Sequence, residues 1–174
     1  MSDRKPRSVP LPLSGPAPAI DKSVWYSEGL SFECTQCGNC CTGSPGYVWL
    51  TIDDMEKIAD HLGLPFDDFT RTYVRRIAGG RGGGNRFSLL EKKNYDCVFL
   101  TRDDKGKAGC RIYSVRPMQC RTWPFWNENL QSPAAWKRAG ERSGGCPGMR
   151  DAKAPGYDLE HIEKCRQHPE SPGA

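Results

Sequence analysis

The sequence lacks any apolar run near the length of about 18 residues that a membrane-spanning helix needs, so we expect no membrane-embedded segment. Histidine is also scarce. The 174 residues contain three, and His61, His161 and His168 all lie outside the cysteine groups. A cysteine–histidine hydrolase is therefore poorly supported. Hydrophobic residues make up 37% of the chain, against 19 glycines and 14 prolines, which predicts a thin hydrophobic core.

Neither sign of charge dominates the sequence. The 25 basic and 21 acidic residues leave a formal charge of +4. Two metal sites of four thiolates each would bring this charge to about zero. We therefore do not expect nucleic acid as a partner. Five arginines are instead expected to form a solvated face: Arg71, Arg75, Arg76, Arg81 and Arg86.

The two ends of the chain are expected to lie outside the folded part. The N-terminal segment is basic and rich in proline, and its apolar stretch, 9–13, is too short and too interrupted for a secretory signal peptide. We predict that residues 1–23 form a disordered, Pro-rich tail on a cytoplasmic protein. A folded domain is expected over residues 24–166, followed by a loose C-terminus over residues 167–174.

Between these ends the patterns predict an α+β fold, in the form of a small irregular single domain with short helices and a short antiparallel sheet or hairpin. Thr51 is an expected helix N-cap, Gly63 an expected C-cap, and Pro65 can start a second helix. The turn 103–106 lies between two strand-like segments, which predicts a β-hairpin. Residues 157–167 are expected to form the last helix.

Two segments carry no clear pattern of secondary structure. The glycine-rich segment 79–84 lacks the Gly-Lys-Ser/Thr ending of a phosphate-binding loop, so we expect a flexible connection there. Residues 127–145 are expected to be irregular.

Nine cysteines are the most informative feature of the sequence. Disulfides are disfavoured, because they need an oxidising compartment and because neighbouring Cα atoms about 3.8 Å apart are too close for a normal bridge between Cys40 and Cys41. Two-residue gaps let two sulfurs converge on one ion while backbone amides point toward them. Cys165 stands alone, and the eight grouped cysteines are the candidate metal ligands: Cys34, Cys37, Cys40, Cys41, Cys97, Cys110, Cys120 and Cys146.

The spacing leaves both zinc and an iron–sulfur cluster open. Cys-x-x-Cys pairs followed by later cysteines are typical of structural zinc sites. Cys34, Cys37 and Cys40 reproduce the three-cysteine run of bacterial ferredoxins, and Cys146-Pro147 is similar to their Cys-Pro. The ferredoxin run has three residues before its next cysteine, whereas this chain has none. Eight thiolates fit two metal sites, or one cluster plus one ion.

Together these motifs resemble the YkgJ-type cysteine-cluster family, described as a zinc- or iron-chelating domain. The resemblance covers about residues 30–150. The motifs that carry it are Cys34-x-x-Cys37-x-x-Cys40-Cys41, Cys97 to Leu100, Cys110 to Arg121, Trp123-Pro124-Phe125 and Cys146-Pro147-Gly148. The family implies that the eight cysteines bind metal. Flagellin lysine methylases resemble the same family, and a four-iron cluster is implicated in them.

Arg116 and Arg121 flank Cys120 on what is expected to be one short helix. A thiolate-rich metal site is negatively charged, so nearby guanidinium groups would offset its charge and donate hydrogen bonds to sulfur. In a redox cluster such contacts raise the reduction potential. We therefore expect both arginines to support the cofactor rather than to bind metal directly.

Three functions follow from these expectations. The first is an iron–sulfur protein with a redox or cluster-dependent role. The second is a structural zinc module that mediates protein interaction, and the third is a protein lysine methyltransferase of the flagellin-methylase type. Visible absorbance separates the first two, and binding of S-adenosylmethionine identifies the third. In each case we expect metal binding to contribute to folding, because the core is thin.

Overall fold

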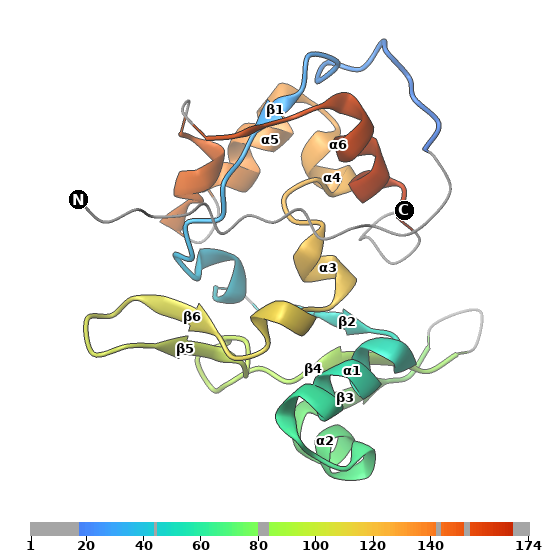
Figure 1. Ribbon diagram of the computed structural model, residues 1–174, viewed down its shortest axis with the longest axis vertical. Coiled ribbons are helices and arrows are strands. Elements are labelled where there is room, and N and C mark those ends of the chain that lie inside the picture. The colour runs from blue at the N-terminus through green and yellow to red at the C-terminus, as the bar shows by residue number, and fades with distance from the viewer. Residues whose placement is uncertain (1–17, 44, 80–83, 142–143, 152–153, 169–174) are drawn as a thin grey trace. The chain divides into compact units, whose positions relative to one another are not determined.

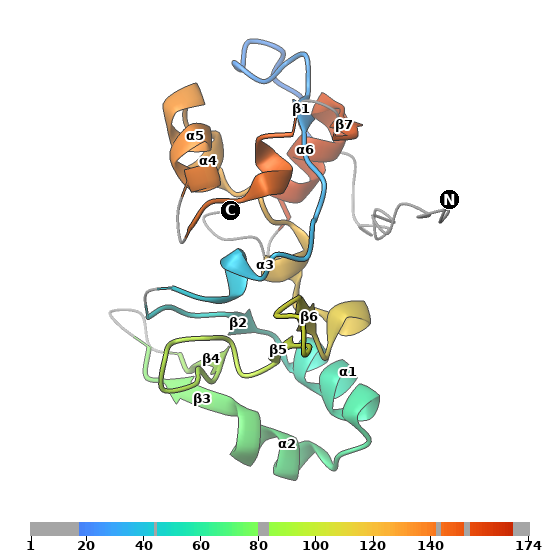
Figure 2. The ribbon, with the colours of Figure 1, turned by 90° about the vertical axis from the view of Figure 1, so that its left-hand side faces the viewer.

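The computed structural model describes residues 18–43, 45–79, 84–141, 144–151 and 154–168. The chain forms two compact units, a central unit of residues 38–121 and a terminal unit made of residues 1–37 and 122–174. Both contain short helices and short antiparallel strands, as Figures 1 and 2 show. The expected α+β class, with short helices and small antiparallel sheets, is thus confirmed.

The described residues of the central unit form two longer helices, a one-turn helix, a three-stranded sheet and a hairpin. Its antiparallel sheet has the strand order β2-β4-β3, and β5 pairs with β6 in the expected hairpin around residues 103–106. The elements, in chain order, are β2 (Trp49–Leu50), α1 (Ile52–Leu62), α2 (Phe66–Tyr73), β3 (Val74–Ile77), β4 (Arg86–Leu89), β5 (Leu100–Arg102), β6 (Ala108–Cys110) and α3 (Met118–Arg121).

Helix α1 begins and ends where the sequence predicts. The backbone N–H of Asp54 donates to the Thr51 hydroxyl at 3.0 Å, and the N–H of Thr51 donates to the Asp54 carboxylate at 3.2 Å. This reciprocal pair is a capping box, which satisfies two N–H groups that the first turn leaves without helical partners. At the other end Gly63 adopts φ 66°, a left-handed conformation that glycine reaches without strain.

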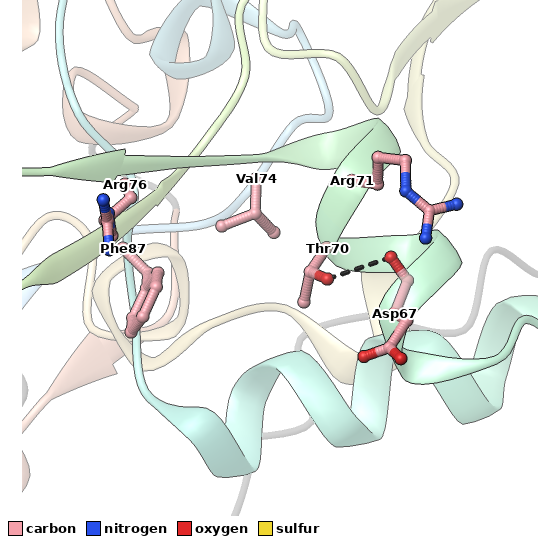
Figure 3. A pocket seen from close by; sticks show the side chains of 6 residues that line it. All are labelled: Asp67, Thr70, Arg71, Val74, Arg76 and Phe87. Carbon is pink, nitrogen blue, oxygen red and sulfur yellow. Dashed lines mark hydrogen bonds between the residues drawn. The ribbon is translucent and has the colours of Figure 1, made fainter.

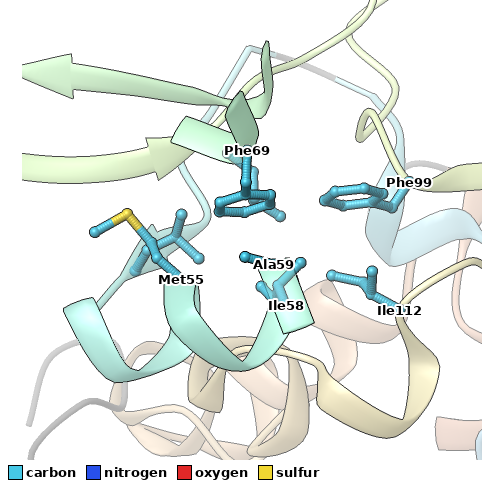
Figure 4. Close-up of a cluster of buried hydrophobic side chains, with 8 residues drawn as sticks. Met55, Ile58, Ala59, Phe69, Phe99 and Ile112 are labelled. Carbon is cyan, nitrogen blue, oxygen red and sulfur yellow. The ribbon is translucent and has the colours of Figure 1, made fainter. Parts of the chain in front are cut away.

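One hydrophobic core lies between the helices and the sheet of the central unit. Figure 4 shows Met55, Ile58 and Ala59 of α1 facing Phe69 of α2, with Phe99 and Ile112 alongside. Strand residues complete this cluster, namely Leu50, Leu89 and the partly buried Val74 and Phe87. The core therefore includes Phe99 and Ile112, each two residues from a cysteine, so the cysteine-bearing segments are anchored by ordinary apolar packing.

The terminal unit holds an aromatic core. Phe125 is buried and contacts the rings of Phe32, Trp136 and Tyr157 at centroid distances of 6.2, 5.9 and 5.1 Å. Such edge-on and offset ring pairs are favourable beyond the area they bury. The elements around this core are β1 (Leu30–Ser31), α4 (Asn127–Leu130), α5 (Pro133–Glu141), β7 (Gly156–Tyr157), which pairs with β1, and α6 (Leu159–Arg166).

The expectation that residues 127–145 are irregular was wrong, because α4 and α5 occupy much of this range. Helix α5 starts at Pro133, a residue whose fixed φ suits the first helical position. The Ser132 hydroxyl accepts a hydrogen bond from the N–H of Ala135 at 3.1 Å, which caps the helix. The burial of Ala135 and Ala139 then fixes the helix by packing that the local sequence does not reveal.

The carboxylate of Glu163 forms a buried hydrogen-bonded network in the terminal unit. Glu163 is fully buried, accepts from the Tyr26 hydroxyl at 2.7 Å and pairs with Arg166 at 2.6 Å. Burial alone would raise the pKa of Glu163, but the hydrogen bonds from Arg166, Tyr26 and Gln167 together lower it. Burial and the contact with Glu163 raise the pKa of Tyr26 to about 12. The side chain of Gln167 also donates to the carbonyl of Ala19 at 2.7 Å.

Parts of some expectations fall outside the described residues. These are residues 1–17 of the expected tail, residues 80–83 of the expected glycine-rich connection, and residues 169–174 at the C-terminus. The expected domain boundaries stay a prediction. No helix among the described residues has both the length and the apolar character to cross a membrane.

We predict that Phe69→Ala lowers the free energy of unfolding by about 3–5 kcal/mol, because it leaves a cavity in the core of the central unit. The matched control is Phe66→Ala in the same helix, since Phe66 is 38% exposed whereas Phe69 is fully buried. The control is expected to cost less than about 1 kcal/mol. Urea unfolding followed by circular dichroism measures both, and equal losses would contradict this core assignment.

We also predict that Glu163→Gln destabilises the protein by about 2 kcal/mol at pH 7, because it removes the charge that Arg166 and Tyr26 surround. The lowered pKa of Glu163 means that its carboxylate stabilises the fold above the unfolded-state pKa, and that this gain is lost as the pH falls through the folded-state pKa. The difference from wild type should therefore shrink between pH 7 and pH 3 in urea unfolding. The exposed Glu160→Gln, in the same helix, is the control.

Candidate metal centre

Five of the eight predicted ligands belong to the central unit, where four separate segments carry them. Cys40 and Cys41 lie in a 3-10 turn over Asn39–Cys41, and their sulfurs are 3.7 Å apart. The N–H of Cys97 donates to the carbonyl of Cys41 at 2.7 Å, which joins two of these segments directly. Cys110 ends β6 and Cys120 lies in α3. Cys40 is exposed and the other four are half-buried.

Gly38 is what allows the Cys40–Cys41 turn to approach the hairpin. Its φ is 78°, in the left-handed region that favours glycine, and its carbonyl accepts from the N–H of Cys41 at 2.9 Å. A Cβ at this position would lie 2.7 Å from the Cβ of Ala108 in β6. Any larger residue would therefore push the turn away from the strand that carries Cys110.

The thiols of the central unit influence one another electrostatically. The hydrogen bond between Cys40 and Cys41 lowers the pKa of Cys40 to about 7 and raises that of Cys41, because one sulfur donates to the thiolate of the other. Burial raises the pKa of Cys120, and the thiolates of Cys97 and Cys40 raise it further. Burial likewise raises the pKa of Cys97, with a contribution from Cys110. Several thiolates this close together need a positive partner to stay ionised.

Arg116 supplies one positive charge in this neighbourhood. Its guanidinium lies 3.9 Å from the centre of the Tyr113 ring, and its Nε donates to the Tyr113 carbonyl at 3.1 Å. From there its charge lowers the pKa of both Cys40 and Cys120, against the effect of burial. The expected role of Arg116 in supporting a bound metal stays a prediction.

Arg121 is placed differently. It acts electrostatically on Lys57 of α1, and its Nε is buried with no hydrogen-bond partner among the described residues. The expectation that Arg116 and Arg121 share one helix was wrong, because α3 begins at Met118. Pro117 disfavours a helical conformation at the residue before it, so Arg116 is extended at φ −55° and ψ 140°.

The other three predicted ligands, Cys34, Cys37 and Cys146, belong to the terminal unit. The N–H of Glu33 donates to the carbonyl of Gly148 at 3.2 Å, and a Cβ on Gly148 would lie 1.8 Å from the Glu33 carbonyl oxygen. The backbone segments that carry Cys34 and Cys146 therefore run in direct contact. Cys165, which was not a predicted ligand, is buried in α6, and burial raises its pKa to about 12.

The described residues contain no group of three or more Cys, His, Asp or Glu side chains that is arranged to hold one ion. The chemistry of the donor set nevertheless fits a thiophilic metal. All five candidate ligands in the central unit are thiols, and thiolates select zinc, copper(I) or iron–sulfur clusters over hard cations such as magnesium. The five cysteines of the central unit are thus the right residue type, in neighbouring positions, to hold zinc or an iron–sulfur cluster. Metal binding would require their side chains to turn toward a common point.

The central unit also has a hollow of about 340 Å³ between α2 and the sheet, which Figure 3 shows. It is lined by Asp67, Thr70, Arg71, Val74, Arg76 and Phe87, and contains none of the predicted metal ligands. Arg71 is paired with Asp68 at 2.9 Å on the exposed side of α2. The hollow is therefore separate from the thiol chemistry.

Gln119 is a structural residue of this region that sequence reasoning missed. Its side-chain oxygen accepts from the N–H of Trp49 at 2.8 Å, and its side-chain nitrogen donates to the carbonyl of Tyr47 at 3.0 Å. The amide thus imitates a neighbouring strand along the outer edge of β2. Because Gln119 directly precedes Cys120, it joins the sheet to a candidate ligand. The 70-residue separation from Trp49 leaves no local signal for this contact.

The region of the chain that matches known proteins contains the same cysteines. Residues 33–147 match the sequence model of the CxxCxxCC family, which is described as a "putative zinc- or iron-chelating domain". This range covers well over half of the chain and includes all eight predicted ligands. The chain belongs to this family.

Among curated proteins, the chain is similar to an uncharacterized protein of Methanocaldococcus jannaschii. The two are 36% identical over 100 residues, which cover 58% of this chain and 48% of that protein. The chain therefore spans about half the length of this relative. No solved structure matches the chain.

We predict that Gln119→Leu loosens the edge of β2, at a cost of about 1–2 kcal/mol for two lost hydrogen bonds. The specific readout is faster hydrogen exchange at the Trp49 amide, which donates to Gln119. Gln131→Leu, at the exposed end of α4, is the control and should leave that amide unchanged. Slow exchange at Trp49 in the Gln119 variant would rule out the bond in solution.

Proposed function

We propose that the chain is an iron–sulfur protein with a redox or cluster-dependent role. The observation that carries this proposal is that five thiols from four segments of the central unit lie near enough to shift one another's pKa values, and that no histidine or carboxylate of the described residues is among the causes of these shifts. Iron–sulfur clusters are held by cysteine thiolates, commonly four for each cluster. The family description, which names iron or zinc, is compatible with this ligand chemistry.

The residues that would hold metal are the eight cysteines that lie in groups along the sequence. Cys40, Cys41, Cys97, Cys110 and Cys120 supply more than the four thiolates of one site, and Cys34, Cys37 and Cys146 supply three more. When bound, an iron–sulfur cluster supplies one-electron redox chemistry. The chain's own contribution is to hold the thiolates, to neutralise their charge and to limit water.

The guanidinium of Arg116 supports a role beyond simple chelation. Its position against Tyr113 is fixed by a ring contact and a hydrogen bond, and its charge already favours the ionised forms of Cys40 and Cys120. A fixed positive charge beside ligand thiolates stabilises the more negative, reduced state of a cluster and so raises its potential. The same role for Arg121 stays a prediction.

A structural zinc module is the second candidate. Eight thiolates can close two tetrahedral zinc sites and leave no open coordination position, which would make the metal structural rather than catalytic. The anchoring of Cys97 and Cys110 beside the core residues Phe99 and Ile112 favours this role, because metal binding there would stabilise the fold directly. The methyltransferase alternative stays a prediction, which binding of S-adenosylmethionine would test.

The deciding experiment is anaerobic purification followed by an absorption spectrum and metal analysis of the same sample. We predict a brown protein with broad absorbance at about 400 nm, together with iron and acid-labile sulfide, as expected for thiolate-bound clusters. A colourless protein with about two zinc ions per chain would overturn the iron–sulfur proposal in favour of the zinc module.

Two cysteine variants show whether the predicted ligands bind that metal. Cys120→Ser is expected to lower metal affinity by about tenfold or more, because serine is a poor substitute for a thiolate ligand. Cys165→Ser is the matched control, since Cys165 is buried outside the predicted ligand set, and it should retain the metal. Circular dichroism of both samples separates loss of metal from loss of fold. Equal metal content in folded samples would exclude Cys120 as a ligand.

A further inference from the structure

The central sheet has a second face, on the side away from the hydrophobic core. Paired strand residues share a face, and Trp49 and Arg75 both pair with Ser88, on the side opposite Leu50 and Leu89. Arg86, two residues from Ser88 along β4, lies on the same side. We call the surface formed by Tyr47, Trp49, Arg75 and Arg86 the arginine–aromatic face.

Four planar groups form a column on this face. The rings of Tyr47 and Trp49 stack with centroids 4.6 Å apart and planes inclined by 10°. The guanidinium carbon of Arg75 lies 4.6 Å from the centre of the Tyr47 ring, and that of Arg86 lies 3.6 Å from the centre of the Trp49 ring. Because the rings cover each other's inner faces, the two guanidiniums lie at the two ends of the column.

The two ends of the column differ. Arg75 donates to the carbonyl of Gly46 and pairs with Glu91 at 3.3 Å, so its end is closed by protein. Arg86 is exposed, and among the described residues its guanidinium has no hydrogen bond or ion pair. One face of its guanidinium rests on Trp49, and within the described part of the chain the N–H edges of this exposed residue bond to no other side chain.

Charge is distributed unevenly around the sheet. Helices α1 and α2, which pack on the core face, carry six carboxylates against Lys57 and Arg71: Asp53, Asp54, Glu56, Asp60, Asp67 and Asp68. Strands β3 and β4 carry no acidic residue, and two of their arginines, Arg75 and Arg86, lie on the arginine–aromatic face, whereas Arg76 pairs with Phe87 and lines the hollow beside α2. An anionic ligand is therefore favoured on the arginine–aromatic face over the helical side.

We propose that the arginine–aromatic face binds single-stranded nucleic acid. A base stacks on the free plane of the Arg86 guanidinium, which continues the column, while the N–H edges donate to a phosphate of the same strand. An acidic peptide would use only the edges, whereas a nucleotide uses both the plane and the edges. These arginines are expected from the sequence to form a solvated face. Arg86 is exposed and Arg75 is half-buried, and both guanidiniums lie over aromatic rings.

This binding does not depend on which metal the cysteines hold, although Gln119, next to Cys120, holds the backbone of Tyr47 and Trp49 in place. The full chain is therefore tested with its metal as purified. Fluorescence anisotropy is measured with labelled 12-nucleotide strands of oligo(dT) and oligo(rU), with a DNA duplex and with a peptide of 12 glutamates. We expect dissociation constants of about 1–100 µM for a single strand at moderate salt.

Three variants separate stacking from charge. Arg86→Gln should weaken single-strand binding roughly tenfold, as expected for the loss of one stacked base. Arg86→Lys keeps the charge but not the plane, and should also weaken binding several-fold. The control is Lys105→Gln, which removes one exposed charge from the β5–β6 turn and should change affinity less than about twofold.

Weaker single-strand binding by both Arg86 variants, with folding unchanged by circular dichroism, supports the proposal. Whichever of oligo(dT) and oligo(rU) binds more tightly then identifies DNA or RNA as the ligand. The proposal is overturned if neither strand binds at 100 µM protein, or if Arg86→Gln behaves like Lys105→Gln. It is also overturned if the glutamate peptide or the duplex binds as tightly as the single strands. Wild-type affinity in Arg86→Lys would exclude stacking.

Discussion

The candidate metal centre of the central unit depends on the close approach between the Cys40–Cys41 turn and the β5–β6 hairpin. Gly38 permits it, because a side chain at that position would collide with Ala108. The hydrogen bond from Cys97 to the Cys41 carbonyl then holds a further thiol-bearing segment beside the turn. The thiols are consequently brought near one another by backbone contacts, before any metal contributes, and the electrostatic cost of ionising them together is what a cation would relieve.

The same segments also serve the hydrophobic core. Phe99 and Ile112 are buried beside α1 and α2, and each is two residues from a candidate ligand. A displacement of either cysteine therefore disturbs apolar packing, and a core mutation moves a ligand. This sharing explains how a chain with 37% hydrophobic residues can position several thiols at once. It also means that metal binding and folding are expected to be coupled in both directions.

Local chemistry made part of this structure predictable. Helix caps and tight turns are determined by residues only a few positions apart. The structure accordingly has the ends of α1 at Thr51 and Gly63, and a hairpin around the turn at 103–106. The cysteine spacing likewise indicated the family. The helices of 127–145 were missed because packing against the aromatic core, rather than a strong periodic pattern, stabilises α5. The contacts of Gln119 and the arginine–aromatic face depend on strand register between distant segments, which a single sequence does not reveal.

The amide of Gln119 has a consequence for association between molecules. An outermost strand normally offers a row of free N–H and C=O groups, on which a strand of another molecule can add and begin aggregation. The N–H of Trp49 in β2 and the carbonyl of Tyr47, just before this strand, are already bonded to the Gln119 side chain. That side chain occupies two positions along this edge without offering a further edge of its own. The sheet is therefore blocked at β2 against growth by strand addition.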